Sequence, residues 1–284
     1  MPRNLTSFVD EACGFDPTDS MLPLTVEGVL AGWVKKSFAE HLSEFPELFS
    51  VRGRGVGMVG RFESAEHRSA ALTETVETLA ERGFIQGWRD EQVSVAESFY
   101  SPPLLYVERA ATRYFGFTTY AVHLNGLTIK DGEAWMWIAE RADSRPVDPG
   151  KHDNLVAGMI ARGATPLGTV IKEANEEAGL GAGLASKARS TGAIRCKRQV
   201  DEGLHHEITF VHDIVLPADF VPKNLDGEVK SFRCLPVSEV IPMLETPGLF
   251  TMDAAVVILD CLIRRGELSA AREDYLDIIH AIRP

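Results

Sequence analysis

The sequence predicts an α/β (α+β) protein with two parts, a smaller α/β domain at residues 1–116 and a strand-rich domain at residues 117–284. The chain has 284 residues, 45% hydrophobic and 25% charged, which is typical of a soluble globular protein and leaves room for two modest domains or one large one. Strand-like segments become frequent after Phe115, and one well-capped amphipathic helix lies among them. No linker rich in Gly, Ser or Pro marks the boundary, so we place it where the pattern changes.

The first part is expected to mix helices with short strands. Its apolar spacing predicts helices over residues 25–42, 64–82 and 105–114, and strands within residues 49–60 and 92–95. Ser64 is suited to cap the second of these helices, and Gly83 directly follows it.

The second part alternates strands and helices. The strands are predicted at residues 120–129, 133–141, 193–199, 207–215 and 228–234. The helices are predicted at residues 166–178, 237–244, 252–265 and 270–282. Thr251 and Gly266 bracket the third helix as suitable caps.

The helix at residues 166–178 carries the strongest local signals. Thr165 can cap it, Pro166 suits the first helical position, and Gly179 suits the left-handed position after the last turn. At 100° per residue one arc of the helix surface is apolar, which predicts a core-facing stripe of Leu167, Val170, Ile171, Ala174 and Ala178.

Three glutamates, Glu173, Glu176 and Glu177, lie together beside the predicted stripe, because positions i, i+3 and i+4 are neighbours on a helix. Two like charges about 4 Å apart repel by about 4 kcal/mol at an effective dielectric constant near 20. A divalent cation would turn this repulsion into binding, because hard cations prefer carboxylate oxygens. Three glutamates alone are equally well explained as part of a solvated helix face. The pattern becomes specific only when Gly158 and Gly179 are required together with them.

Residues 158–180, GMIARGATPLGTVIKEANEEAGL, resemble the signature box of the Nudix hydrolases, G-x5-E-x7-R-E-U-x-E-E-x-G-U, where U is aliphatic. The matching residues are Gly158, Glu173, Glu176, Glu177, Gly179 and Leu180, with Ala174 a weak match at the first aliphatic position. The box departs from the family at two positions: Ala164 replaces its first Glu, and Lys172 replaces its Arg. Lysine keeps the charge but lacks the planar fork of arginine.

The resemblance extends beyond the box to residues 106–129, 135–163 and 203–240. These stretches are similar to a Nudix subgroup in which an N-terminal α/β domain precedes the hydrolase domain. Its plant and fungal members are related to thiamine pyrophosphokinases, and some act on thiamine diphosphate and its oxidised forms. The resemblance implies a Nudix α/β/α sandwich with a mixed sheet and hydrolysis of a diphosphate linkage in a small organic or nucleoside diphosphate, with Mg²⁺ or Mn²⁺ as the cofactor.

The resemblance also implies the metal ligands. Glu173, Glu176 and Glu177 match the acids that hold the catalytic metal, and the carbonyl of Gly158 is a further candidate ligand. The family often adds an acidic ligand from a later loop, and Glu228 is our candidate for it. The alternative, which we weigh equally, is that Glu228 is a solvated charge at the edge of a strand. The residue that activates water varies within the family, so the general base stays open.

Basic residues near the box are candidates for binding the substrate phosphates. They are Lys172, Arg195 and Lys197, with Arg141 and Lys151 preceding the box. Arg195 and Lys197 share one face of a strand, so both could contact phosphate. The competing interpretation is that they are surface charges that keep the protein soluble. His205 and His206 are adjacent and point to opposite faces if extended, so at most one faces the site.

The charge and cysteine content limit the partners and the compartment. A net charge of −12 argues against nucleic acid and opposes capture of an anion, so a diphosphate substrate needs bound cations and a local basic cluster. We expect no membrane span, because no apolar run of about 18 residues occurs, and no signal peptide, because the N-terminal stretch MPRNLTSFVDEACGF lacks an apolar core. The 4 cysteines show no C-x-x-C spacing and indicate reduced thiols in the cytoplasm.

Two alternatives to hydrolysis remain open at this stage. One is a non-catalytic Nudix-like module that binds a diphosphate, with Ala164 and Lys172 as early signs of decay. The other is an isomerase of the isopentenyl-diphosphate type, which shares the fold and needs its own cysteine and glutamate pair. The N-terminal domain could add substrate contacts or a homodimer surface.

Overall fold

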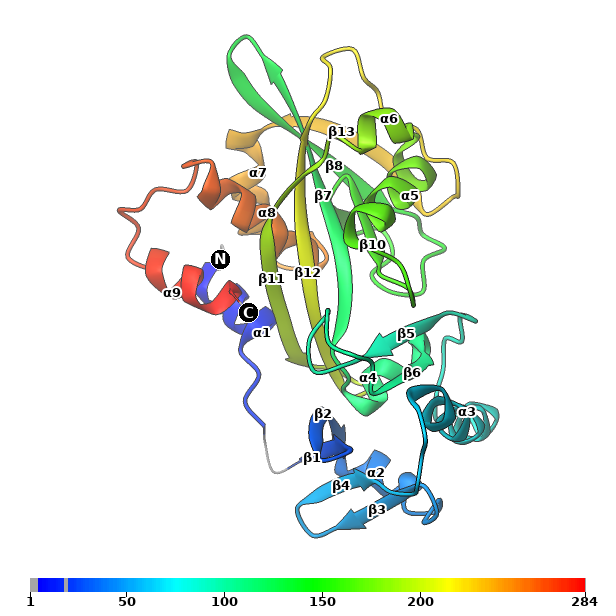
Figure 1. Ribbon diagram of the computed structural model, residues 1–284. Helices are drawn as coiled ribbons and strands as arrows, with labels where there is room; N and C mark the ends of the chain where they lie inside the picture. The colour runs from blue at the N-terminus through cyan, green and yellow to red at the C-terminus, as the bar shows by residue number, and fades with distance from the viewer. Residues whose placement is uncertain (1–4, 18–19, 284) are drawn as a thin grey trace.

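The computed structural model describes residues 5–17 and 20–283, and Figure 1 shows its elements. Residues 1–4, 18, 19 and 284, which belong to the predicted domain spans, lie outside the described residues. A small sheet with its helices forms one end of the molecule, and a larger sheet with helices on both faces forms the rest.

The N-terminal sheet is mixed. Its strand order is β2-β1-β4-β3, formed by β1 (Met21–Val26), β2 (Val29–Lys35), β3 (Phe49–Arg52) and β4 (Gly55–Met58). The other elements here are α2 (Lys36–Leu42), α3 (Ala65–Glu81), the hairpin of β5 (Gln92–Val95) and β6 (Leu105–Glu108), the 3₁₀ turn η1 (Arg109–Ala111) and α4 (Thr112–Phe115). One apolar core joins them, from Leu22 in β1 to Phe117 after α4.

Two helix predictions in this part are wrong. Residues 25–42 form a hairpin followed by a short helix, because Glu27 and Gly28 adopt positive φ angles of 50° and 80° and turn the chain back on itself. Residues 105–114 begin as strand β6, in which Leu105 and Val107 are buried on alternate positions. The helix predicted at residues 64–82 is confirmed, with Ser64 accepting a hydrogen bond from the backbone N–H of His67 at its start.

The larger sheet is also mixed. Its main path is β11-β12-β7-β8-β13, with β10 paired to β7 and β9 paired to β8. The strands are β7 (Thr119–Lys130), β8 (Glu133–Arg141), β9 (His152–Asp153), β10 (Val156–Met159), β11 (Arg189–Gln199), β12 (Leu204–Val215) and β13 (Val229–Pro236). Strand β12 runs parallel to β7, while β7 and β8 are antiparallel.

Helices cover both faces of this sheet, which confirms the predicted α/β/α sandwich (Figure 1). One face packs against α5 (Pro166–Ala178) and α6 (Ala182–Ala185). The other packs against α7 (Val237–Leu244), α8 (Met252–Arg264), α9 (Tyr275–Ile282) and α1 (Leu5–Cys13). Helix α1 therefore packs with the C-terminal elements, although it precedes the N-terminal sheet in the chain.

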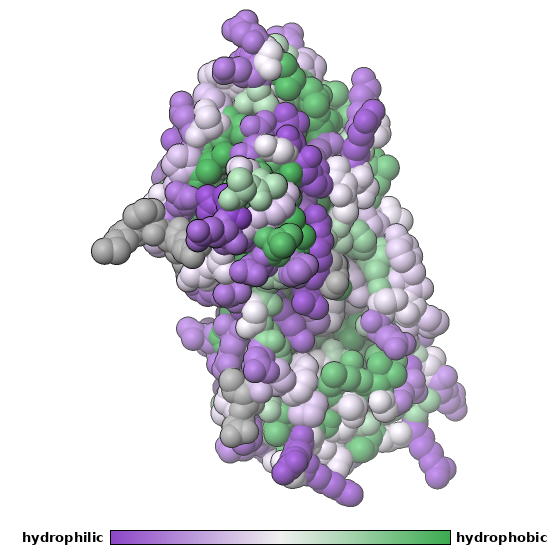
Figure 2. Space-filling model, turned by 90° about the vertical axis from the view of Figure 1, so that its left-hand side faces the viewer, coloured by the Kyte–Doolittle hydropathy of each residue, from purple (hydrophilic) through white to green (hydrophobic). Residues whose placement is uncertain are grey.

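The remaining sequence predictions for this part are close to the structure. The predicted strands and helices all occur, but α9 begins at Tyr275, because residues 267–274 form turns. Among the described residues no helix is long and apolar enough to cross a membrane. The face shown in Figure 2 carries apolar residues in separate groups among hydrophilic ones.

Candidate active site

Helix α5 is positioned by its ends and by its apolar stripe. Thr165 Oγ1 accepts a hydrogen bond from Gly168 N at 3.2 Å, and Gly179 ends the helix in the left-handed region. Val170, Ala174 and Ala178 are buried against the sheet, as predicted. Leu167 is 42% exposed, so its predicted place in the core is wrong: it lies in the first turn.

Glu177 lies closer to the core than the sequence indicated. Its side chain is buried, and Oε2 accepts a hydrogen bond from Ala157 N at 2.9 Å. Burial raises the pKa of Glu177 well above its usual value, and the nearby charges of Asp153, Glu173 and Glu228 raise it further. None of the described ion pairs gives Glu177 a cationic partner, so a bound cation would relieve a real electrostatic cost.

Gly158 on β10 lies directly against Glu173. A Cβ atom at position 158 would lie 2.4 Å from Glu173 Cγ and 2.7 Å from Cδ, which is inside van der Waals contact. Glycine therefore lets the Glu173 side chain approach strand β10. This close approach gives a physical reason for glycine at the first position of the box.

We expect Gly158→Ala to displace Glu173 and to lower activity by about 100-fold, the usual scale for misplacing a reacting group by about 1 Å. Overpacking is expected to cost about 1–3 kcal/mol of unfolding free energy. Steady-state rates and denaturant unfolding measure the two effects. Gly183→Ala in α6 is the matched control, because a Cβ there meets no atom within 4 Å. Full activity in Gly158→Ala would contradict the proposed packing.

Lys172 bridges two of the box carboxylates. Its Nζ lies 3.0 Å from Glu173 Oε1 and 2.9 Å from Glu176 Oε2, while the side chain is 61% exposed. Burial would lower the pKa of Lys172, but the hydrogen bonds and charges of Glu176 and Glu173 outweigh burial and raise it. In this structure the ammonium group of Lys172 therefore pairs with the two carboxylates.

Glu228 comes next to the box from the loop before β13. It forms an ion pair with Arg145, and Glu228 and Glu177 together line a small cavity. Asp226 Oδ1 accepts a hydrogen bond from Glu228 N at 2.9 Å and so fixes the turn that carries Glu228. The structure thus brings together the four predicted metal-binding glutamates and Gly158.

A larger cavity adjoins the small one, and the two share Arg141, Arg145, Asp153 and Ala157. All three guanidinium nitrogens of Arg141 donate, Nη1 to Asp153 Oδ2 at 3.0 Å and Nε and Nη2 to the carbonyl of Val147. Arg145 Nε is buried and has no acceptor among the described residues. Arg145 therefore keeps one N–H donor that the described protein groups leave unused.

The two predicted phosphate ligands on β11 lie outside both of these cavities. Arg195 and Lys197 do not line the larger cavity, and Lys197 Nζ lies 4.8 Å from the centre of the Phe15 ring. Burial lowers the pKa of Lys197, with a further contribution from Arg195. Lys151 pairs with Asp148 at 2.6 Å.

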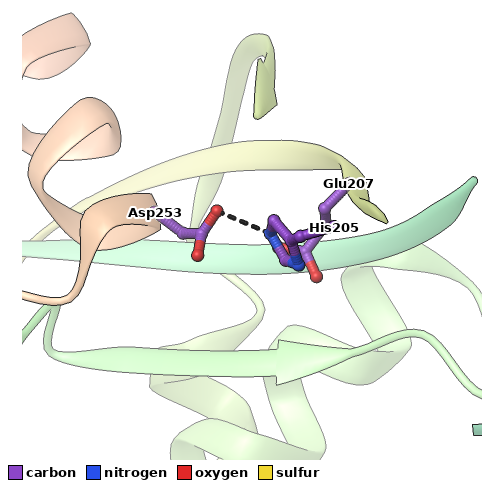
Figure 3. A group of neighbouring side chains, drawn as sticks. All are labelled: His205, Glu207 and Asp253. Atoms are coloured by element: carbon purple, nitrogen blue, oxygen red, sulfur yellow. Dashed lines mark hydrogen bonds and ion pairs between the residues drawn. The ribbon is translucent and has the colours of Figure 1, made fainter. Parts of the chain in front are cut away.

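The floor of the larger cavity carries a polar cluster that the sequence did not reveal, shown in Figure 3. His205 Nε2 lies 2.9 Å from Asp253 Oδ1, with Glu207 beside them. Their ligand atoms lie within 4.8 Å of one another, as in a metal site. Both oxygens of Asp253, however, accept hydrogen bonds from Arg198, at 3.0 and 2.9 Å, so its charge is already balanced.

Both adjacent histidines line the larger cavity. His206 Nδ1 lies 2.9 Å from Thr118 Oγ1, and burial, then the charges of Lys197 and Arg195, lowers the pKa of His206 to about 3. His206 is therefore neutral at pH 7 and adds no charge to the cavity. His205 belongs instead to the ion-pair cluster of Asp253 and Arg198.

We expect Asp253→Asn to lower the unfolding free energy by about 3 kcal/mol at pH 7, because the buried Arg198 would lose its counter-charge. Burial would raise the pKa of Asp253, but the charges and hydrogen bonds of His205 and Arg198 outweigh burial and hold it well below its usual value. Such a group stabilises the fold above its unfolded pKa of about 3.9 and loses this effect as the pH falls further.

The stability gap between wild type and Asp253→Asn should therefore shrink below about pH 4. Urea unfolding at pH 7 and at pH 3 measures the gap. The exposed Asp219→Asn is the matched control and should leave stability unchanged within about 0.5 kcal/mol. An equal stability of Asp253→Asn and wild type at pH 7 would show that the Arg198 pair contributes nothing.

Two family models match adjacent parts of this chain. A family model described as "Domain of unknown function (DUF4743)" matches residues 7–119, and the NUDIX domain model matches residues 120–255. Nudix hydrolase 20, chloroplastic, of Arabidopsis thaliana is 33% identical over 279 residues, 95% of this chain and 75% of the relative. Nudix hydrolase 24, chloroplastic, of the same plant is 33% identical over 292 residues, 100% of this chain and 80% of the relative.

A crystal structure of a Deinococcus radiodurans protein is similar with a TM-score of 0.48 and 16% identity, covering 60% of this chain and 99% of that one. The two plant relatives span most of this chain and most of their own lengths. The chain therefore belongs to the Nudix hydrolase family, whose members cleave pyrophosphate bonds.

Proposed function

We propose that this hydrolase uses Mg²⁺ or Mn²⁺, held by Glu173, Glu176, Glu177 and Glu228, to cleave the diphosphate linkage of a small organic or nucleoside diphosphate. One observation carries the proposal. Glu177 of α5 and Glu228 line a small cavity that shares Arg141 and Arg145 with the larger one, so a site for cations adjoins a site for anions. A diphosphate bound to a divalent cation has this combination of charges.

The residues fit a hard divalent cation. Glu177 is a buried carboxylate with no cationic partner among the described residues, and Glu173 and Glu228 add negative charge to its surroundings. The available donors are carboxylate oxygens and the Gly158 carbonyl, which suit Mg²⁺ or Mn²⁺ better than softer metals. When bound, the cation would lower the pKa of the attacking water and offset charge on the phosphate oxygens.

The protein residues have separate tasks in this scheme. Ala157 N orients Glu177 through the 2.9 Å hydrogen bond, and Lys172 Nζ holds Glu173 and Glu176 near each other by donating to both carboxylates. Arg145 lines the cavity in which the phosphate would bind, and its ion pair with Glu228 keeps it beside the carboxylates. Positioning and charge balance account for most of phosphoryl-transfer catalysis, so this arrangement suits the reaction.

Thiamine diphosphate and its oxidised forms are the first substrates to test, because of the resemblance to the subgroup described above. The test is a screen for phosphate release in the presence of Mg²⁺ or Mn²⁺. The screen also includes nucleotide sugars, dinucleotides and oxidised nucleotides as substrates. Release from at least one compound supports hydrolysis. Tight binding of a diphosphate with no turnover of any compound would instead indicate the non-catalytic module.

The isomerase alternative lacks support at the cavity. Among the described residues that line it, none is a cysteine. Its test is direct: the same screen with isopentenyl diphosphate distinguishes isomer formation from phosphate release.

We also propose a domain boundary between residues 116 and 117 and a cytoplasmic location. The boundary lies next to the change of core: the N-terminal apolar core extends to Phe117, and the first strand of the larger sheet starts at Thr119. All four cysteines are free thiols, which suits a reducing compartment. A homodimer remains a hypothesis that the molecular mass in solution tests.

A further inference from the structure

The larger cavity is built from both parts of the chain. Its lining includes three arginines from the N-terminal domain, Arg89, Arg109 and Arg113, opposite residues of the hydrolase sheet. The same three arginines line a second, neighbouring cavity. In a chain with a net charge of −12, a group of cations around one cavity is a distinct local feature.

A buried carboxylate holds two of these arginines in place. Glu108 accepts backbone N–H hydrogen bonds from Arg89 at 2.9 Å, Glu91 at 3.1 Å and Ala110 at 3.1 Å. Arg109 N also donates to the carbonyl of Glu91 at 2.8 Å. The loop that carries Arg89 and the turn that carries Arg109 are therefore fixed side by side.

Close packing places the third arginine against the hydrolase domain. A Cβ atom at Gly203 would lie 2.3 Å from the carbonyl oxygen of Arg113, so only glycine allows the turn before β12 to approach α4 this closely. Arg113 Nη1 lies 3.7 Å from Glu202 Oε1, which is too long for a hydrogen bond. This contact fixes Arg113 at the cavity while leaving most of its donors open.

The arginines are only partly neutralised by protein groups. No described carboxylate lies within ion-pair distance of Arg89. Arg109 pairs with Glu91 at 2.8 Å, but its five donors exceed what one carboxylate accepts. Guanidinium groups recognise phosphate oxygens in a bidentate manner, so a phosphate is the ligand that this set fits.

We propose that Arg89, Arg109 and Arg113 bind a phosphate group of the substrate, so that the N-terminal domain completes the substrate site of the hydrolase domain. This inference rests on the function proposed above for the α5 carboxylates. The carboxylates and their cation hold the phosphate that is attacked, and the arginines hold the second phosphate across the cavity. The domain of unknown function thereby acts as a substrate-binding domain.

The test uses the full-length protein and two readouts. The variants are Arg89→Gln, Arg113→Gln and the double variant, with Arg113→Lys to retain charge. Loss of one charge-assisted contact of about 1.5 kcal/mol corresponds to about tenfold. We expect KM for the substrate found in the screen to rise about tenfold for each arginine replaced, with Arg113→Lys recovering part of the loss. The matched control is Arg82→Gln, an arginine of the same domain that pairs with Glu44 outside the cavity.

The second readout does not depend on turnover. Titration calorimetry measures the binding of inorganic pyrophosphate in the presence of a chelator, so that no cation contributes. We expect wild type and Arg82→Gln to bind it and the double variant to bind at least about tenfold more weakly. Equal pyrophosphate affinity in wild type and the double variant, or no binding by wild type at millimolar concentration, overturns the inference.

The two proposals fail separately. If no diphosphate is hydrolysed but pyrophosphate binding depends on the arginines, the proposed function fails and the arginine site stands. If hydrolysis occurs and neither KM nor pyrophosphate binding changes in the double variant, the arginine site fails and the hydrolase stands. Circular dichroism of each variant confirms that a weakened affinity does not come from unfolding.

Discussion

Replacing Glu177 by Gln is expected to lower kcat by about 10³-fold, because the loss of a charged metal ligand removes several kcal/mol of transition-state stabilisation. Glu177 is the box carboxylate that is buried and held by Ala157 N, so no exposed neighbour can take its place. The fold is expected to tolerate the change, since a neutral amide costs less to bury than a carboxylate. Initial rates at saturating substrate and Mg²⁺ measure the effect.

The exposed Glu267→Gln provides the matched control, because it removes one carboxylate from the same domain outside the site. It should retain wild-type kcat. Glu173→Gln and Glu176→Gln should also lower kcat, and a smaller loss at Glu176 would agree with its greater exposure. A kcat for Glu177→Gln within twofold of wild type would exclude Glu177 from the metal site.

Removing divalent cations is expected to abolish turnover, with at least about a 10³-fold fall in rate. The chain has a net charge of −12 and places several carboxylates where the attacked phosphate would lie, so without a cation that phosphate would meet strong repulsion even when the arginines bind the other one. The measurement compares phosphate release in excess chelator with release after adding back Mg²⁺ or Mn²⁺. An unchanged rate in the chelator would show that the carboxylates do not act through a metal.

The sequence predicted α5 well because its signals are local. The cap at Thr165, the glycine at 179 and the apolar spacing each depend on neighbours within a few residues, and all are present in the structure. The N-terminal hairpin was missed because its turn depends on positive φ angles at Glu27 and Gly28, and Glu-Gly is a weak turn signal. Local patterns therefore located helix α5 more reliably than the strands of the first domain.

The difference between Glu176 and Glu177 shows the limit of helical periodicity. The helical wheel places both beside the apolar stripe, but only Glu177 is buried, because strand β10 and Ala157 N lie over it. That contact joins residues 20 positions apart, which no local pattern encodes. Burial of a single carboxylate thus depends on tertiary packing.

The basic residues of the site illustrate the same limit. Of the basic residues favoured by proximity in sequence, Arg141 lines the cavity but Arg195 and Lys197 do not. Arg145 and arginines of the N-terminal domain line it as well. The pair of Arg198 with Asp253 spans 55 residues and could not be read from spacing. The sequence around a charged residue carries no periodic pattern that identifies its ion-pair partner. The partner is therefore known only once the fold is known.

The central claim is that a divalent cation on the α5 carboxylates supports cleavage of the diphosphate. Its most direct test is a Mn²⁺ titration in which bound Mn²⁺, measured by electron paramagnetic resonance, and phosphate release are followed in the same samples. We expect turnover of wild type to rise in proportion to bound Mn²⁺, and Glu177→Gln to bind Mn²⁺ at least about tenfold more weakly with a matching loss of turnover. Full turnover before Mn²⁺ binds, or unchanged Mn²⁺ affinity in Glu177→Gln, would contradict the claim.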